Sequence, residues 1–259
     1  MTPFKLIRIL ILSSIFLILA FGAKREKLRS RSWAEPLDVV VYPINGDNGS
    51  QIVDDYIASL ETRLFEPVDR FLQQQSEDYE LIADQPTRIR LGRTLDELPP
   101  ESPRPQSGLP AIIWWGIQFR YWVYRHTPDD AADIRVLALY HEAKKGRHLQ
   151  HSLGLDKGLV AMVHAFAHSE QAAQNNIVIA HELLHTVGAT DKYDADNQPV
   201  FPEGYADPDQ SPLHPQTLAE IMAGRIPLAE TEAKMADSLD DCVIGETTAR
   251  EINWLRDQQ

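Results

Sequence analysis

The sequence predicts one mixed α/β domain of the α+β kind, in which a twisted sheet packs against a long apolar helix. Two observations predict this class. Runs rich in β-branched residues alternate with stretches of helical periodicity, and no segment repeats. A later helical pattern, residues 169–187, carries His181, Glu182 and His185 within a mainly apolar stretch. A chain of 259 residues is long enough to bury a single large core.

Residues 1–23 are predicted to be a signal peptide or a membrane anchor, followed by a basic and polar linker over residues 24–36. Bases precede an uncharged apolar run, residues 9–23, whose length suits a signal core or a short anchor better than a full transmembrane helix. Two orientation rules conflict here. The positive-inside rule favours a cytoplasmic location for the basic residues after this run, whereas a short N-terminal segment with a basic start normally directs the following chain out of the cytoplasm. We expect a membrane-anchored or exported protein whose domain, residues 37–259, lies outside the cytoplasm.

Strand and helix patterns alternate in the first half of the domain. Residues 37–44 (LDVVVYPI) form a β-branched run of strand length, closed by the turn-like NGDNGS. Residues 51–75 keep a 3.6-residue apolar rhythm, which predicts one amphipathic helix, and residues 87–92 (TRIRLG) form a short strand. After a proline-rich surface loop, residues 111–126 are dense in aromatics and fit either a buried helix or a strand.

Three strand-like segments precede the histidine-bearing helix. They are residues 133–143, 151–155 (HSLGL) and 159–167, and the turn between the last two predicts a hairpin or adjacent strands. Ser169 is a candidate N-cap for the helix, and Gly188 is its predicted stop. This order of elements describes one domain rather than two.

Composition argues against two classes of function. The net charge is −13, and beyond Arg31 the chain holds 18 bases and 37 acids, which gives −19. Such a body cannot neutralise phosphates, so no nucleic-acid partner is expected. Cys242 is the only cysteine, which excludes an intramolecular disulfide and gives no support for redox chemistry.

The sequence HELLH, residues 181–185, predicts a metal-binding helix. On a helix, His181 and His185 project from one face one turn apart, so both imidazoles can reach one Zn²⁺ at about 2.0–2.1 Å. Glu182 points partly to the same side, where it can take a proton from a metal-activated water. Gly188 can end the helix and reverse the chain, which lets Asp191 return to the metal as a third ligand.

The full pattern H-E-x-x-H-x-x-G-x-x-D, from His181 to Asp191, resembles the signature of the metzincin zinc proteases, whose last position is usually histidine. Aspartate at that position is similar to the snapalysin-type branch, and a carboxylate oxygen is an acceptable zinc ligand. The resemblance implies a metzincin-like mixed twisted sheet, an active-site helix and a C-terminal subdomain.

A second segment resembles the same family. Met222, in LAEIMAGRIP, is similar to the methionine of the family's Met-turn. Some metzincins carry a tyrosine two residues after this methionine, but Gly224 stands there in this chain. Tyr193 and Tyr205 are the candidates for that role.

A rival zinc arrangement takes its third ligand from a glutamate on a later helix, as in thermolysin-like enzymes. Glu203 and Glu220 are the nominal candidates. Gly188 and the loop-like residues 194–212 favour Asp191 instead. The other histidines are not expected to bind zinc: His126, His141, His148, His151, His164, His168 and His214.

These observations and the resemblance together predict a zinc-dependent endopeptidase that hydrolyses peptide or protein substrates. Family members pair an extended substrate with a sheet-edge strand, and HSLGL is the candidate edge. One alternative is a membrane-tethered, non-catalytic protein with structural zinc, which would not need Glu182. Another is the hydrolysis of a non-peptide amide by the same centre.

Overall fold

The computed structural model describes residues 28–81, 85–103, 107–127, 132–144, 149, 152–155 and 159–255. The predicted signal or anchor, residues 1–23, lies outside the described residues. Within the described part, no helix has both the length and the apolar character needed to cross a membrane. The helices are α2 (Gln51–Ala58), α3 (Glu66–Asp78), α4 (Leu109–His126), α5 (Ala172–Thr186) and α6 (Glu246–Glu251), with 3₁₀ turns at Thr62–Phe65, Ser169–Gln171 and Leu239–Asp241.

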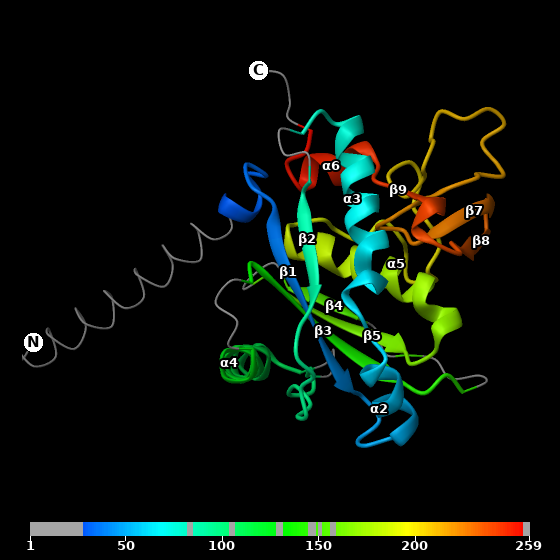
Figure 1. Cartoon of the computed structure of the whole chain (residues 1–259). Helices are drawn as coiled ribbons and strands as arrows, with labels where there is room; N and C mark the ends of the chain where they lie inside the picture. Colours follow the sequence, from blue (N-terminus) through cyan, green and yellow to red (C-terminus); the bar gives the residue numbers. More distant parts are fainter. Residues whose placement is uncertain are drawn as a thin grey trace, which may run out of the picture.

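A five-stranded sheet in the order β2-β1-β3-β5-β4 forms the centre of the molecule (Figure 1). Its strands are β1 (Leu37–Asn45), β2 (Thr87–Leu91), β3 (Ile134–His141), β4 (Leu153–Leu155) and β5 (Val160–Phe166). β2, β1, β3 and β5 run parallel, whereas β4 pairs antiparallel with β5 through Leu153↔Met162 and Leu155↔Val160. The predicted mixed α/β class is confirmed, and Leu153–Leu155 of the HSLGL segment form the edge strand β4.

Helices cover both faces of this sheet, because the side chains of each strand alternate between two cores. In β1, Val39 and Val41 pack with α2, α3 and α5, while Val40 and Tyr42 pack on the other face. That second face is covered by α4 through Phe119, Trp122 and Val123, among others. Figure 1 shows α4 on one side of the sheet and α3 and α5 on the other.

Two sequence-based boundaries were wrong and one ambiguity is resolved. Residues 51–75 form two helices, because the chain leaves the α-helix at Ser59 and passes through a 3₁₀ turn before α3. Residues 111–126 are helical, within α4. His168, rather than Ser169, is the N-cap of the 3₁₀ turn that leads into α5, since its side chain accepts a hydrogen bond from the Glu170 N–H.

The segment expected to be a linker ends inside the domain. Trp33 is 2% exposed and belongs to the larger core, where its ring lies edge-on to Trp254 at 5.5 Å. Its Nε1–H donates to the carbonyl oxygen of Ile252 at 2.6 Å. The first and last described segments of the chain therefore pack against each other in the same core.

The chain after α5 builds short two-stranded sheets beside the main one. β6 (Ala219–Glu220) pairs with β9 (Cys242–Val243), and β7 (Arg225–Ala229) pairs with β8 (Glu232–Met235). Cys242 is buried and its thiol is free. Ala219 of β6, Ile226 of β7 and Cys242 of β9 belong to the same core cluster as the buried side of α5.

Candidate metal centre

Helix α5 carries the three residues of the HELLH pattern that the sequence singles out. Asn175 fixes the first turn to the neighbouring strand, because its amide exchanges two hydrogen bonds with the Phe166 backbone at 2.9 and 3.0 Å. The helix ends at Thr186, and the Gly188 N–H donates to the His185 carbonyl oxygen at 3.1 Å. Gly188 has φ +110°, a conformation that favours glycine, so the chain turns back as predicted.

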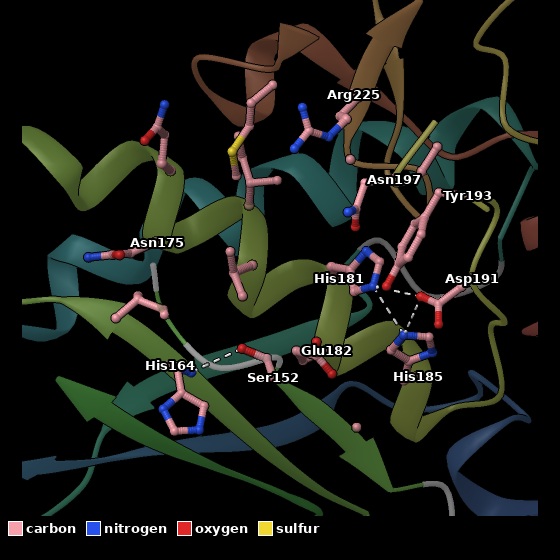
Figure 2. A pocket seen from close by; sticks show the side chains of 18 of the residues that line it. Ser152, His164, Asn175, His181, Glu182, His185, Asp191, Tyr193, Asn197 and Arg225 are labelled. Carbon is pink, nitrogen blue, oxygen red and sulfur yellow. Dashed lines mark hydrogen bonds and ion pairs between the residues drawn. The ribbon is translucent and has the colours of Figure 1, made fainter. Parts of the chain in front are cut away.

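This reversal brings Asp191 against both histidines (Figure 2). Asp191 Oδ1 lies 3.2 Å from His181 Nε2 and 3.1 Å from His185 Nε2. The two Nε2 atoms are 3.1 Å apart. Three ligand-type atoms from two segments of the chain therefore meet at one point.

The other nitrogen of each imidazole is held by a backbone carbonyl. His181 Nδ1 lies 3.0 Å from the Ile221 carbonyl oxygen, and His185 Nδ1 lies 2.8 Å from that of Ala189. A carbonyl oxygen can only accept, so each Nδ1 carries the proton. In the neutral imidazoles each Nε2 then presents a lone pair towards Asp191, an arrangement typical of metal-ligating histidines.

The cluster fits a small metal cation. Bonds of about 2.0–2.1 Å in a tetrahedral arrangement place ligand atoms roughly 3.3 Å apart, close to the observed separations. His181, Glu182 and His185 form a group able to hold a metal ion, with ligand atoms within 4.8 Å of one another. Without a cation, a proton on Nε2 of a histidine must lie between that nitrogen and Asp191 Oδ1, because lone pairs at these distances repel one another. Burial lowers the pKa of His185, but hydrogen bonds to Asp191 and Ala189 outweigh it and raise that pKa.

Asp191 is positioned by the residues on either side of it. Thr190 N–H and Oγ1 donate to the two carboxylate oxygens of Glu251 at 2.9 and 2.7 Å. Lys192, 6% exposed, pairs with the same carboxylate at 2.8 Å and donates to the Thr190 carbonyl oxygen at 3.0 Å. Helix α6 therefore holds the loop that presents Asp191, a connection that no sequence motif indicates.

Glu182 lies beside the cluster and lines the pocket, although its side chain is buried. It is 6% exposed, and its Oε2 has no hydrogen-bond partner among the described residues. Burial raises the pKa of its carboxyl group, and the nearby His181 and His185 oppose this rise less strongly. A carboxylate in this position can accept a proton from a group bound in the pocket.

Gly154 of β4 is a residue of the site that sequence reasoning missed. A Cβ at this position would overlap the Cβ of His185 and lie 2.6 Å from the Glu182 carbonyl oxygen. The backbone of the edge strand β4 therefore packs directly against the turn of α5 between Glu182 and His185. The missed signal is the glycine in the middle of HSLGL, since a glycine inside a strand often marks a close approach.

Met222 lies in a tight turn that supports His181. The turn is closed by the Ala223 and Gly224 N–H groups, which donate to the Glu220 carbonyl oxygen at 3.0 and 2.9 Å. Met222 is fully buried, and its neighbour Ile221 supplies the carbonyl that holds His181 Nδ1. The segment singled out as resembling a Met-turn thus contacts the histidine cluster through its backbone.

The rival third ligands lie elsewhere. The Glu220 carboxylate is fully buried and accepts from the Met222 and Ala223 N–H groups and from Thr248 Oγ1. Glu203 is exposed and does not line the pocket that contains the histidines. Asp191 is the carboxylate that the structure brings to both Nε2 atoms.

The histidines and Asp191 open into a pocket of about 680 Å³, a size typical of ligand sites. Tyr193 lines it, whereas Tyr205 does not and lies 3.0 Å from His214 Nε2 instead. Burial and the negative charge of Asp191 raise the pKa of Tyr193 to about 12, so the phenol keeps its proton. Asn197 and Arg225 also line this pocket (Figure 2).

A buried chain of polar residues reaches the opposite wall of the pocket. Asp47 Oδ1 lies 2.8 Å from His141 Nδ1, and His141 Nε2 lies 2.9 Å from His164 Nδ1. Burial, and to a smaller extent His141, lowers the pKa of His164 to about 4. Among the described residues, neither histidine belongs to the group that could hold a metal ion, but His164 does line the pocket. His148 and His151 lie outside the described residues.

Comparison with known proteins adds little to this geometry. No family model matches the sequence, and no curated protein matches it. Two crystal structures of wild-type OgpA from Akkermansia muciniphila, in different crystal forms, match with a TM-score of 0.39 and 12% sequence identity. Each match covers 83% of this chain and 59% of OgpA, so this chain spans less than two thirds of that protein. A similarity this low carries no conclusion about activity.

Proposed function

We propose that this protein is a zinc-dependent peptidase of the metzincin type, with His181, His185 and Asp191 as the metal ligands. One observation carries the proposal: two imidazole Nε2 atoms and a carboxylate oxygen meet within 3.1–3.2 Å. Both Nδ1 atoms are committed to carbonyl oxygens, which leaves the Nε2 lone pairs for a cation. Two nitrogens and one carboxylate oxygen form a ligand set used by catalytic zinc, and a fourth position stays open for water or substrate.

The neighbouring side chains suit hydrolysis. A zinc ion held there would act as a Lewis acid towards the scissile carbonyl and would make water more acidic. Glu182 is within 4.8 Å of the histidine nitrogens and is the base that takes the proton from the attacking water and passes it to the leaving amine. Tyr193 lines the pocket, and its protonated hydroxyl is hydrogen-bonded to Asp191; once a metal holds Asp191, this hydroxyl is our candidate donor to the substrate oxygen as negative charge develops on it.

An extended peptide is the substrate that the surroundings of the site favour. β4 is an edge strand, and its Gly154 packs against the helix turn that carries Glu182 and His185. Gly154 lines the same pocket as these two residues. A peptide strand added beside β4 would run across the histidine cluster, with backbone hydrogen bonds supplying affinity. The predicted anchor would present this activity at a membrane, on its non-cytoplasmic side.

Metal analysis of the purified full-length protein, together with digestion of a peptide library, tests the proposal. We expect one zinc per chain and peptide cleavage that a chelator abolishes and added zinc restores. Zinc bound without cleavage of any peptide or simple amide would make the centre structural. Cleavage that persists after complete removal of the metal would refute the mechanism.

A further inference from the structure

Helix α4 is apolar on the side that faces the solvent as well as on the side that faces the sheet. Its inner side buries Phe119, Trp122 and Val123. Its outer side exposes six large apolar or aromatic residues to between 53% and 81%: Leu109, Ile113, Trp114, Ile117, Tyr121 and Tyr124. A helix that is hydrophobic all round belongs in a protein interior or in contact with lipid. We call these six residues the α4 stripe.

The stripe is one continuous surface. Ile113, Ile117, Tyr121 and Tyr124 follow one another at spacings of four, four and three residues, so they line one side of the helix. At 100° per residue, this line points away from the side that Phe119 and Trp122 bury. A contiguous exposed apolar surface of this kind marks an interaction site.

The chemistry of the stripe matches the boundary between lipid headgroups and acyl chains. Trp and Tyr combine an apolar ring with a polar group and are enriched at that level of a bilayer. α4 carries Arg120 and Arg125 and no acidic residue, although the whole chain has a net charge of −13. The helix is thus an aromatic element without acidic residues on an acidic protein, as in helices that lie in the membrane interface.

The N-terminal segment limits how far the domain can be from a membrane. The apolar run ends at Ala23, and the chain is fixed to the domain from Arg29, which pairs with Asp133 at 3.1 Å. Six residues span at most roughly 20 Å. Asp133 lies directly before β3, the strand that follows α4 in the chain, so the N-terminal segment is attached where the connection from α4 enters the sheet.

We propose that the α4 stripe lies in the surface of the membrane that the N-terminal apolar segment enters, as a second, monotopic contact. The inference rests on the prediction that residues 1–23 are membrane-embedded. It is independent of the proposed peptidase activity.

This placement orients the candidate metal centre. α4 covers one face of the sheet, whereas α5, with His181 and His185, covers the other. With α4 in the bilayer surface, the sheet lies between the lipid and the pocket. The pocket then opens to water, which suits a substrate that is not embedded in the same membrane.

Trp114 is a built-in reporter for the test, since it is 61% exposed and residues 1–23 contain no tryptophan. Full-length protein is reconstituted into phosphatidylcholine vesicles with and without brominated acyl chains, which quench tryptophan at short range. We expect brominated lipid to lower the emission, and Trp114→Phe to remove at least half of that loss. We expect the triple variant Ile113→Ser, Ile117→Ser and Tyr121→Ser to reduce the quenching of Trp114 at least twofold. Ile52→Ser is the matched control, because Ile52 is 62% exposed on α2, on the other face of the sheet, and should change nothing.

Two outcomes would overturn the proposal. If Trp114→Phe leaves the lipid quenching unchanged, or acrylamide in water reaches Trp114 as easily in vesicles as in detergent, the stripe faces the solvent. If Trp114 is shielded from acrylamide but not quenched by brominated lipid, a protein covers the stripe instead, and light scattering in detergent shows whether it is a second copy. Zinc content and peptide cleavage in detergent should be the same in all these variants, so this test is independent of the proposed peptidase function.

Discussion

Lys192 and Glu251, 59 residues apart in the chain, form an ion pair of 2.8 Å in which the lysine is almost fully buried. Thr190 donates to the same carboxylate, so both residues that flank Asp191 in this loop are tied to helix α6. The position of the candidate third ligand therefore depends on a helix that contributes nothing to the site itself.

The first prediction concerns this ion pair. Glu251→Gln keeps the shape but leaves the Lys192 charge without its counterion, which costs about 1–3 kcal/mol of unfolding free energy. Mutation of a residue that positions a metal ligand typically lowers metal affinity by about 10- to 100-fold, so zinc should bind at least tenfold more weakly to Glu251→Gln. Glu246→Gln on the same helix is the control, since its exposed pair with Arg250 is worth about 0.5 kcal/mol or less. Equal zinc affinity in both variants would show that α6 does not position Asp191.

The second prediction separates the two possible third ligands. Asp191→Ala should weaken zinc binding by more than about 100-fold, since it removes a direct ligand rather than an outer-shell partner. Glu203→Ala should leave zinc binding unchanged, because that side chain lies outside the pocket. Competition with a chelator of known affinity measures both. The opposite ranking would assign the thermolysin-like arrangement to this chain.

The third prediction concerns Glu182. Glu182→Gln keeps the side-chain volume and should leave zinc bound, because Glu182 is the base and not a ligand in the proposed mechanism. Peptide hydrolysis should fall by about 10²–10⁴-fold or more. The melting temperature should stay the same or rise, since a buried carboxylate without a partner on Oε2 is replaced by a neutral amide. Unchanged turnover in the zinc-loaded variant would exclude this role.

The fourth prediction concerns the close packing of β4 on α5. Gly154→Ala places a methyl group against His185 and the Glu182 backbone, so we expect a loss of about 1–3 kcal/mol in unfolding free energy and weaker zinc binding. Gly116→Ala is the matched control, because a Cβ there meets nothing within 4 Å. In the middle of α4 it should stabilise the protein by about 0.5–1 kcal/mol. Denaturant titrations of both variants measure the difference.

The fifth prediction is a pH dependence that originates at His164. On one side, His164 contacts His141, which in turn contacts Asp47. On the other side, His164 lines the pocket that also contains Glu182 and His181. The pKa of His164 is about 4 in the folded protein, against 6.5 for a solvated histidine, so the unfolded chain takes up this proton first as the pH falls. Folding should lose stability between about pH 6.5 and pH 4. In His164→Gln, the drop in melting temperature from pH 7 to pH 4.5 should be smaller than in the parent. An identical drop in both proteins would contradict the assignment.

Local patterns predicted most of the elements that carry the site. The spacing of His181 and His185 places both on one side of any helix, and Gly188 ends that helix because a positive φ favours a residue without a Cβ. The β-branched runs are strands, and the last three residues of HSLGL form the edge strand β4. The prediction of a single helix over residues 51–75 was wrong, because a continuous apolar periodicity does not reveal that the α-helix ends at Ser59.

By itself the sequence determined the class of fold and three residues on one helix turn, because helical periodicity and glycine conformation are local properties. The spacing around Gly188 favoured Asp191 as the third ligand, but only the tertiary structure shows its carboxylate at both Nε2 atoms, in a loop whose Thr190 and Lys192 are held by Glu251. It also decided that Gly154 and His164 belong to the pocket, and that one apolar side of α4 stays exposed. Each of these depends on pairs of segments far apart in the chain, whose contacts are fixed by packing that no local pattern encodes.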